Sequence, residues 1–158
     1  MTRIVPGVVD VVVVRRVGRG WHVLVLERAP GVRSTGAWEV VHGRIEKGEP
    51  PSRAARRELL EETGLNAQRL YSITVNPFYL GPADTVQLAI AFAAVVDTAK
   101  FTLGPEHRRA RWATFAAARK LLAWPRTHEL LNHVAWLLRS GNAGAVEDVL
   151  RIRNVDSE

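Results

Sequence analysis

Cysteine is absent from the 158 residues of this chain. Its absence excludes both a disulfide framework and a zinc site built on thiolates, and it fits a reducing, cytoplasmic location. A membrane-spanning run is also missing, because the apolar stretch from Val8 to Val14 is short and interrupted by Asp10. The residues from Met1 to Pro6 do not have the pattern of a signal peptide. We therefore expect a cytoplasmic protein with no membrane association.

The composition indicates one compact domain with a substantial core, since 47% of the residues are apolar and the chain carries no low-complexity linker. The formal charge is +6, from 22 basic and 16 acidic residues. A basic excess favours an anionic partner, which can be nucleic acid, a membrane surface or a phosphorylated small molecule. Because the arginines are scattered along the chain, nucleic acid is not the favoured partner.

Hydrophobic patterning predicts strands, then a helix, then strands, then helices. The expected strands are 4–14, 21–26, 38–41, 71–79, 85–96 and 109–113. The expected helices are 51–63, 114–122 and 126–139, with a further one over 142–151. This order is typical of an α+β domain, an α/β/α sandwich with a mixed sheet between helices, and not of a regular βαβ array.

The helix expected at 51–63 carries three carboxylates, Glu58, Glu61 and Glu62, at positions i, i+3 and i+4. They fall within an arc of about 100° on one face. Ala55, Leu59 and Leu60 lie on the other side and are expected to dock on the sheet. Carboxylate oxygens are the ligands that Mg²⁺ prefers, although such a helix face is more often simply solvated.

The residues before this helix favour the metal site. A set of residues follows one another at fixed spacing, namely Gly43, Glu49, Arg57-Glu58-Leu59, Glu61-Glu62 and Gly64-Leu65. With every fixed position of the Nudix box present, the segment from Gly43 to Leu65 resembles a Nudix hydrolase.

The resemblance implies the Nudix fold and a Mg²⁺-dependent attack of water on a diphosphate bond, with Mn²⁺ as a substitute ion. Glu58, Glu61 and Glu62 match the metal-binding carboxylates of the family, and Gly43 matches the position whose backbone carbonyl joins the metal. Arg57 matches the residue that orients the glutamates, and Glu49 matches a supporting acidic position.

A second set of residues is similar to the Nudix branch that contains dihydroneopterin triphosphate pyrophosphatase. The set comprises Asn76 to Leu80, Asp84 to Val86, Glu106-His107, Arg111-Trp112 and Trp124-Pro125. By this resemblance Glu106 is an additional metal ligand or the general base. Glu58 is the other candidate base, and the sequence does not choose between them.

Three residues outside the box are candidates for substrate binding. Arg28 could pair with a phosphate, with a surface ion pair to Glu27 or a neighbour as the alternative. Tyr79 could stack on a base or pterin ring, as could Phe78, although a strand aromatic is more often part of the core. His42 stands beside Gly43, where a structural loop histidine is the simpler interpretation.

We expect residues 1–141 to form the Nudix domain and residues 142–158 to be a helical extension or tail of the same domain, which could serve a homodimer interface. The expected reaction is hydrolysis of a phosphoanhydride bond in a nucleoside triphosphate or a dihydroneopterin triphosphate. The alternatives are ADP-ribose, a dinucleoside polyphosphate or an RNA 5′ end as substrate, and a non-catalytic Nudix-fold binding protein.

Overall fold

A single mixed sheet organises the computed structural model, which describes residues 1–153. Its main path runs β3-β2-β1-β6-β5-β8, while β4 pairs with β1 and β7 pairs with β2. The strands are β1 (Arg3–Val17), β2 (Gly20–Arg28), β3 (Trp38–Glu39), β4 (Val41–Arg44), β5 (Arg69–Leu80), β6 (Thr85–Val95), β7 (His107–Thr114) and β8 (Arg151–Ile152). β1 is parallel to β6 and antiparallel to β2 and β4, so the mixed sheet is confirmed.

The central strand β1 is covered on both faces, which explains its nearly continuous valine run. Val9, Val11 and Val13 pack in one core cluster with α1 (Pro51–Thr63). Val12 and Val14 pack in the other cluster with α3 (Pro125–Leu137). Since side chains alternate across a strand, Asp10 lies on the α3 face.

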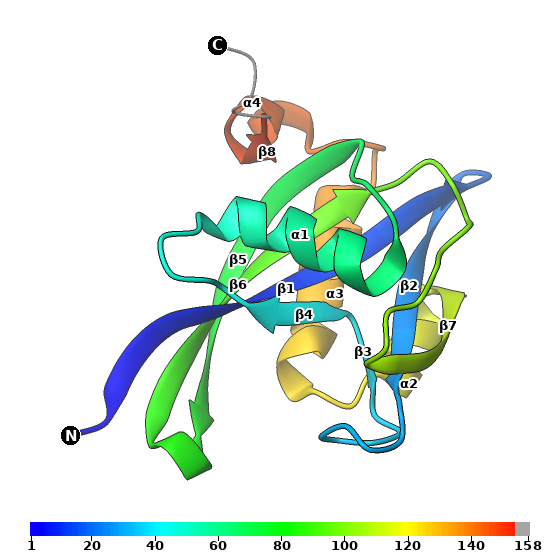
Figure 1. Cartoon of the computed structure of the whole chain (residues 1–158). Coiled ribbons are helices and arrows are strands. Elements are labelled where there is room, and N and C mark those ends of the chain that lie inside the picture. The colour runs from blue at the N-terminus through cyan, green and yellow to red at the C-terminus, as the bar shows by residue number, and fades with distance from the viewer. Residues whose placement is uncertain (154–158) are drawn as a thin grey trace.

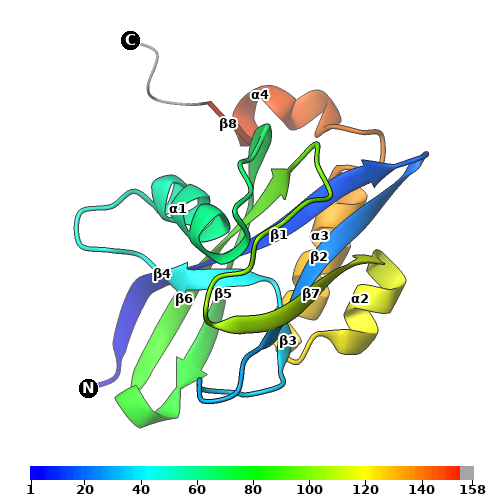
Figure 2. The same cartoon turned by 45° about the vertical axis from the view of Figure 1, so that its right-hand side comes forward.

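The helices form the outer layers. Figures 1 and 2 show α1 across one face of the sheet and α3 behind the other, with α2 (Phe115–Leu121) beside β7. The side chain of Thr114 caps α2 by accepting a hydrogen bond from Ala117 N–H, as predicted. The helices therefore hold β1 and β4 between them, and the candidate site lies on this rigid centre.

The helix α1 has the predicted boundaries. Pro51 opens it, and Gly64 ends it in the left-handed conformation with φ of 70°. Its predicted packing face is wrong at one position, because Leu60 is 50% exposed whereas Ala55 and Leu59 are buried. The helix is turned so that Glu62 faces inward, with an exposed fraction of 5%.

The predicted strand 38–41 is divided in two. Trp38–Glu39 pairs with β2, and Val41–Arg44 pairs with β1. The chain changes its partner strand at Val40, so His42 lies in β4 and not in a loop.

The segment after Gly141 contains less helix than predicted. A 3-10 turn (Gly144–Val146) leads into α4 (Glu147–Leu150), and β8 then pairs with β5. The hydroxyl of Tyr71 donates to Glu147 Oε1 at 2.9 Å, which ties this segment to the sheet. The predicted tail beyond Arg153 lies outside the described residues.

Within residues 1–153, none of the helices combines the length and the apolar character needed to cross a membrane.

Candidate active site

Gly43 and Glu58 meet where β4 passes under α1. A Cβ atom at position 43 would lie 2.0 Å from Cδ of Glu58 and 2.1 Å from its Oε1. The backbone at position 43 therefore touches the carboxylate of Glu58, and any side chain there would displace it. Glycine is required here for space, because its backbone φ is not in the left-handed region.

Arg57 organises the acidic residues around this contact. Its Nη1 donates to Glu58 Oε1 at 2.8 Å and to Glu61 Oε2 at 3.2 Å. Its Nε and Nη2 donate to the two carboxylate oxygens of Glu49 at 2.8 and 3.0 Å, and Nη2 also donates to the backbone carbonyl of Arg44. The guanidinium lowers the pKa of Glu49 to about 2. The arginine thus fixes two of the three helix glutamates and ties them to the loop before the helix.

Glu62 is the buried member of the acidic set. Its Oε2 accepts a hydrogen bond from the backbone N–H of His42 at 3.3 Å, and its Oε1 has no partner in the part of the chain that the structure describes. Burial first, and then the nearby charges of Glu58, Glu39 and Glu106, raise the pKa of Glu62 to about 9. A buried carboxylate that lies among other carboxylates, with one oxygen unpartnered among the described residues, is costly, so a bound cation or a proton would stabilise it.

Glu106 reaches the same region from the loop before β7. Its charge raises the pKa of both Glu58 and Glu62, after the larger effects of burial in each case. The loop is anchored on α1 by Gly104, whose N–H donates to the carbonyl of Glu62 at 3.1 Å. A Cβ at position 104 would lie 2.7 Å from the carbonyl oxygen of Glu61. A second glycine contact therefore sets the position of Glu106.

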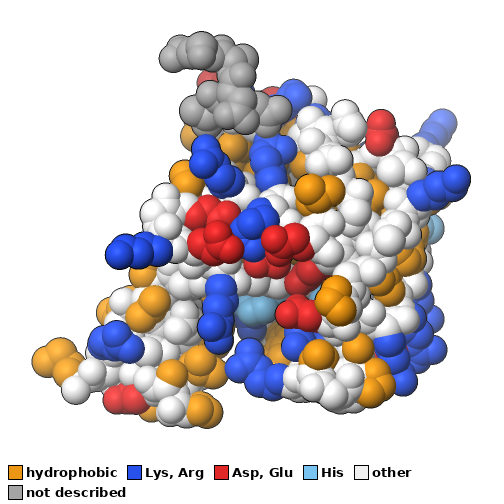
Figure 3. All heavy atoms as spheres, viewed as in Figure 1, with side chains coloured by type: hydrophobic (Ala, Val, Ile, Leu, Met, Phe, Trp, Pro, Cys, Tyr) orange, Lys and Arg blue, Asp and Glu red, His pale blue; other side chains and the backbone are white. Residues whose placement is uncertain are grey.

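These donors suit a hard divalent ion. Carboxylate oxygens and a backbone carbonyl match the oxygen ligands of Mg²⁺, and the unpartnered Oε1 of Glu62 offers a free lone pair. Within residues 1–153, no three acidic, histidine or cysteine side chains already stand in a ligand cluster. Arg57 holds Glu58 and Glu61 in ion pairs at 2.8 and 3.2 Å. Figure 3 shows the acidic side chains gathered over α1, with arginine or lysine among them and a histidine beneath.

A second polar group, centred on Asp10, was not predicted from the sequence. His42 Nδ1 lies 2.8 Å from Asp10 Oδ1, and Arg126 Nε donates to Asp10 Oδ2 at 2.8 Å. Burial alone raises the pKa of Asp10, but the bonds from His42 and Arg126 hold it below its ordinary value. The Arg126 guanidinium lies 4.4 Å from the ring centroid of Phe78. In the sequence, Asp10 interrupts a valine run and His42 and Phe78 were separate candidates for substrate binding, but Arg126 was not singled out.

Glu39 is the centre of a third buried network, which was also missed. Its Oε1 accepts from Arg28 Nη1 at 2.9 Å and contacts His107 Nε2 at 2.8 Å, and its Oε2 accepts from Trp124 Nε1 at 3.2 Å. The sequence had already drawn attention to Arg28, to His107 in Glu106-His107 and to Trp124 in Trp124-Pro125. It gave no sign that Glu39 is the partner they share. The network joins β2, β3, β7 and the start of α3 beside the acidic set.

The candidate substrate-binding residues are distributed unequally. Arg28 lies at the site but pairs with Glu39, while Glu27 pairs with Arg108 and Arg109. His42 lies between Asp10 and the backbone contact to Glu62. Tyr79 is 62% exposed and donates to Asp84 at the β5–β6 turn, so Phe78 is the aromatic that joins the Asp10 group.

Comparison with known proteins identifies one family. A model described as NUDIX domain matches residues 6–134. The octanoyltransferase of Myxococcus xanthus is 38% identical over 113 residues, which is 70% of this chain and 31% of that protein. The ADP-ribose pyrophosphatase of Bacillus subtilis is 43% identical over 56 residues, which is 35% of this chain and 29% of that protein. The chain spans about a third of the length of these curated relatives.

A solved structure gives the same fold. The dihydroneopterin triphosphate pyrophosphohydrolase of E. coli superposes with a TM-score of 0.69 at 22% identity, covering 84% of this chain and 96% of that one. At this identity the likeness shows the fold alone.

Proposed function

Since this chain belongs to the Nudix family, we propose that it hydrolyses pyrophosphate bonds and that it cleaves a nucleoside triphosphate or a dihydroneopterin-like triphosphate with Mg²⁺. Nudix hydrolases generally use divalent metals of this kind, with Mn²⁺ as the expected substitute. The observation that carries the proposal is the inward-facing Glu62, whose free carboxylate oxygen lies among Glu58, Glu39 and Glu106.

The metal would be held by Glu58, Glu61 and Glu62 and by the backbone carbonyl of Gly43, with Glu106 beside it on the neighbouring loop. When bound, Mg²⁺ supplies positive charge to the phosphate oxygens and acidifies water near neutral pH. Arg57 keeps Glu58 and Glu61 oriented through its two Nη1 contacts. The buried Glu62 would give up its proton on binding the cation, because its pKa, raised to about 9, favours the protonated form in the metal-free protein at neutral pH.

We further propose that Glu106 accepts the proton of the attacking water. The competing candidate, Glu58, has Oε1 bonded to Arg57 at 2.8 Å and lies against the backbone of Gly43. Glu106 is exposed on a loop that the Gly104 contact holds on α1. A base must reach the water it deprotonates, and an exposed carboxylate beside the metal site meets this requirement better than a paired one.

The part of the substrate beyond the phosphates would bind at the Asp10 group. Arg126 is fixed by Asp10 and lies against the rings of Phe78 and Trp124, so a guanidinium and two aromatic rings stand next to His42. Planar guanidinium groups stack on aromatic rings, so a nucleobase or pterin ring fits this chemistry.

A product analysis tests the proposal. Purified protein with Mg²⁺ is given a panel of nucleoside triphosphates, dihydroneopterin triphosphate and ADP-ribose, and the products are separated. Release of pyrophosphate from a triphosphate is the expected result. In Glu106→Gln, kcat should fall by about 100-fold or more while the Mg²⁺ concentration for half activity changes less. Unchanged kcat in that variant would contradict its role as base.

ADP-ribose is the second candidate substrate, because the Bacillus subtilis relative is named for that activity. Release of AMP and ribose 5-phosphate from ADP-ribose, without pyrophosphate from any triphosphate, would favour it. A dinucleoside polyphosphate, an RNA 5′ end and a non-catalytic binding role stay as less favoured alternatives that the same panel distinguishes. The homodimer, the cytoplasmic location and the division at residue 141 also stay predictions.

A further inference from the structure

A cavity of about 710 Å³ lies between α1 and the C-terminal segment. It takes Arg56 from α1, Gln68 from the loop before β5, and Glu147, Asp148, Arg151 and Arg153 from the C-terminal segment. None of these residues belongs to the candidate active site or to the Asp10 and Glu39 networks. The cavity is therefore a separate feature that the proposed hydrolysis does not use.

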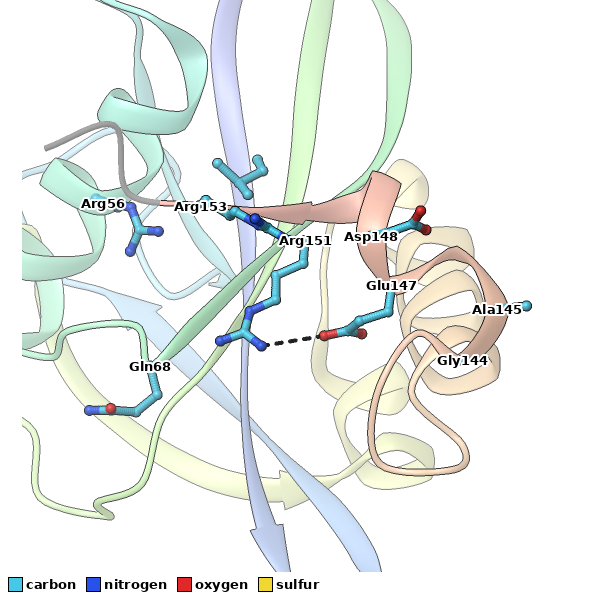
Figure 4. Close-up of a pocket in the computed structure, with 9 residues that line it drawn as sticks. Arg56, Gln68, Gly144, Ala145, Glu147, Asp148, Arg151 and Arg153 are labelled. Atoms are coloured by element: carbon cyan, nitrogen blue, oxygen red, sulfur yellow. Dashed lines mark ion pairs between the residues drawn. The ribbon is translucent and has the colours of Figure 1, made fainter. Parts of the chain in front are cut away.

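Three arginines, Arg56, Arg151 and Arg153, line the cavity. Figure 4 shows Arg56, Gln68 and Arg151, three of the lining residues, on separate elements around the cavity. Arg56 is partly buried, and this burial lowers the pKa of its guanidinium. Within residues 1–153, no carboxylate lies within 4.0 Å of the guanidinium nitrogens of Arg56 or Arg153. A desolvated cation without a counter-charge is stabilised by an anion that enters beside it.

The acidic residues of the lining do not neutralise this charge. Glu147 contacts Arg151 at 3.6 Å, but its oxygens also accept from Tyr71 Oη at 2.9 Å and from Ala143 N–H at 2.8 Å. Asp148 points away from Arg56 and Arg151 in Figure 4. Glu147 is set against Arg151, and among the described residues no ion pair neutralises Arg56 or Arg153.

We propose that this cavity binds a phosphate group carried by a small molecule. Guanidinium forks recognise phosphate oxygens through paired hydrogen bonds, and the side-chain amide of Gln68 can add a neutral donor. The volume exceeds that of a phosphate ion and lies within the range of about 300–1,000 Å³ for small-molecule sites. Free phosphate and a nucleoside monophosphate share the required chemistry, and they differ in how much of the cavity they fill.

An NMR titration of the full chain tests the site without involving hydrolysis. Uniformly ¹⁵N-labelled protein in EDTA is titrated with inorganic phosphate in one series and with AMP in another, at constant ionic strength. We expect saturable shifts of the backbone amides of Gln68, Gly144 and Ala145 in both series. AMP should bind at least threefold more tightly than phosphate, because the monoester fills more of the cavity.

Variants separate the site from a general charge effect. Arg56→Gln and Arg153→Gln should each weaken AMP binding at these amides at least fivefold, while Arg19→Gln, which removes a charge at the exposed β1–β2 turn, should not. Thermal melting checks that each variant is folded, and Arg153→Gln keeps the test valid if Arg56→Gln is unstable. Shifts that do not saturate, that sodium chloride reproduces, or that persist equally in both cavity variants would overturn the proposal. Equal affinity for AMP and phosphate would overturn the assignment of a phosphorylated small molecule.

Discussion

At position 43, the contact between backbone and carboxylate leaves no room for a side chain. Gly43→Ala would place Cβ 2.0 Å from Cδ of Glu58, so the carboxylate must move by an ångström or more. Displacing a catalytic group by that distance costs about 100-fold in rate. We therefore expect kcat/KM of Gly43→Ala to fall by about 100-fold in steady-state assays with Mg²⁺.

The matched control for this prediction is Gly20→Ala, because a Cβ at position 20 would meet nothing closer than 3.9 Å and its φ is not positive. Its activity should equal that of the wild type. Wild-type activity in Gly43→Ala would show that catalysis does not depend on the position of the Glu58 carboxylate against the backbone of residue 43.

Glu62 gives the metal-free protein a characteristic dependence of stability on pH. Its pKa is raised in the folded state from 4.5 to about 9, so the folded protein holds a proton that the unfolded chain releases. Stability should therefore fall as pH rises from about 4.5 to about 9. Glu62→Gln removes this dependence because the amide does not titrate.

Thermal melting in EDTA measures the effect. The Tm of Glu62→Gln minus that of the wild type should increase between pH 5 and pH 8, by at least about 4 °C. Adding Mg²⁺ should reduce the difference at pH 8, since the cation stabilises the ionised carboxylate. A Tm difference that stays constant with pH would contradict the raised pKa.

At the scale of elements, the loop before β7 and the helix α1 act as one unit. Gly104 lies so close to α1 that a Cβ would stand 2.7 Å from the carbonyl oxygen of Glu61. Gly104→Ala should push the loop outward, withdraw Glu106 and destabilise the fold by about 1–3 kcal/mol. Denaturant unfolding measures the stability, and the kcat of the variant should approach that of Glu106→Gln.

A double variant makes this prediction specific. If Gly104 acts through Glu106, Glu106→Gln should lower kcat much less in the Gly104→Ala background than in the wild type. Fully multiplicative effects on kcat would show that the two residues act independently.

Local signals in the sequence predicted α1 well. Pro51 and Gly64 mark its ends by backbone chemistry, and the spacing from Gly43 to Leu65 identified the acidic set. The direction in which the helix faces was predicted less well, since Leu60 is exposed and Glu62 is buried. That orientation depends on how α1 packs over β4, which is a long-range contact.

The Asp10 and Glu39 networks depend mainly on such long-range contacts. Asp10 meets Arg126 across 116 positions of sequence, and Glu39 meets His107 across 68. No local pattern in the sequence links these residues. The strand pairing of β1 with β4 and of β2 with β3 and β7, together with the packing of α3, brings them together. Pairwise spacing in the sequence contains no such information.

At the scale of the whole molecule, the segment after Gly141 contributes to stability and lies outside the candidate active site. It supplies Glu147 to Tyr71 and pairs Ile152 with Leu70. A chain shortened to residues 1–141 should lose about 5–10 °C in Tm and retain kcat/KM within about twofold. Calorimetry and steady-state kinetics test the two parts. A large loss of activity at a temperature where the shortened chain is folded would contradict the separation of this segment from the site.

The central claim is that Glu62 and its neighbours hold the metal that drives hydrolysis. The most direct measurement compares Mg²⁺-dependent turnover of the best triphosphate substrate in wild type, in Glu62→Gln and in Glu129→Gln, which alters an exposed residue on α3. With Mg²⁺ limiting, we predict that Glu62→Gln loses at least about 100-fold in kcat/KM while it stays folded, and that Glu129→Gln matches the wild type. Full activity of a folded Glu62→Gln at limiting Mg²⁺ would contradict the assignment of the metal site.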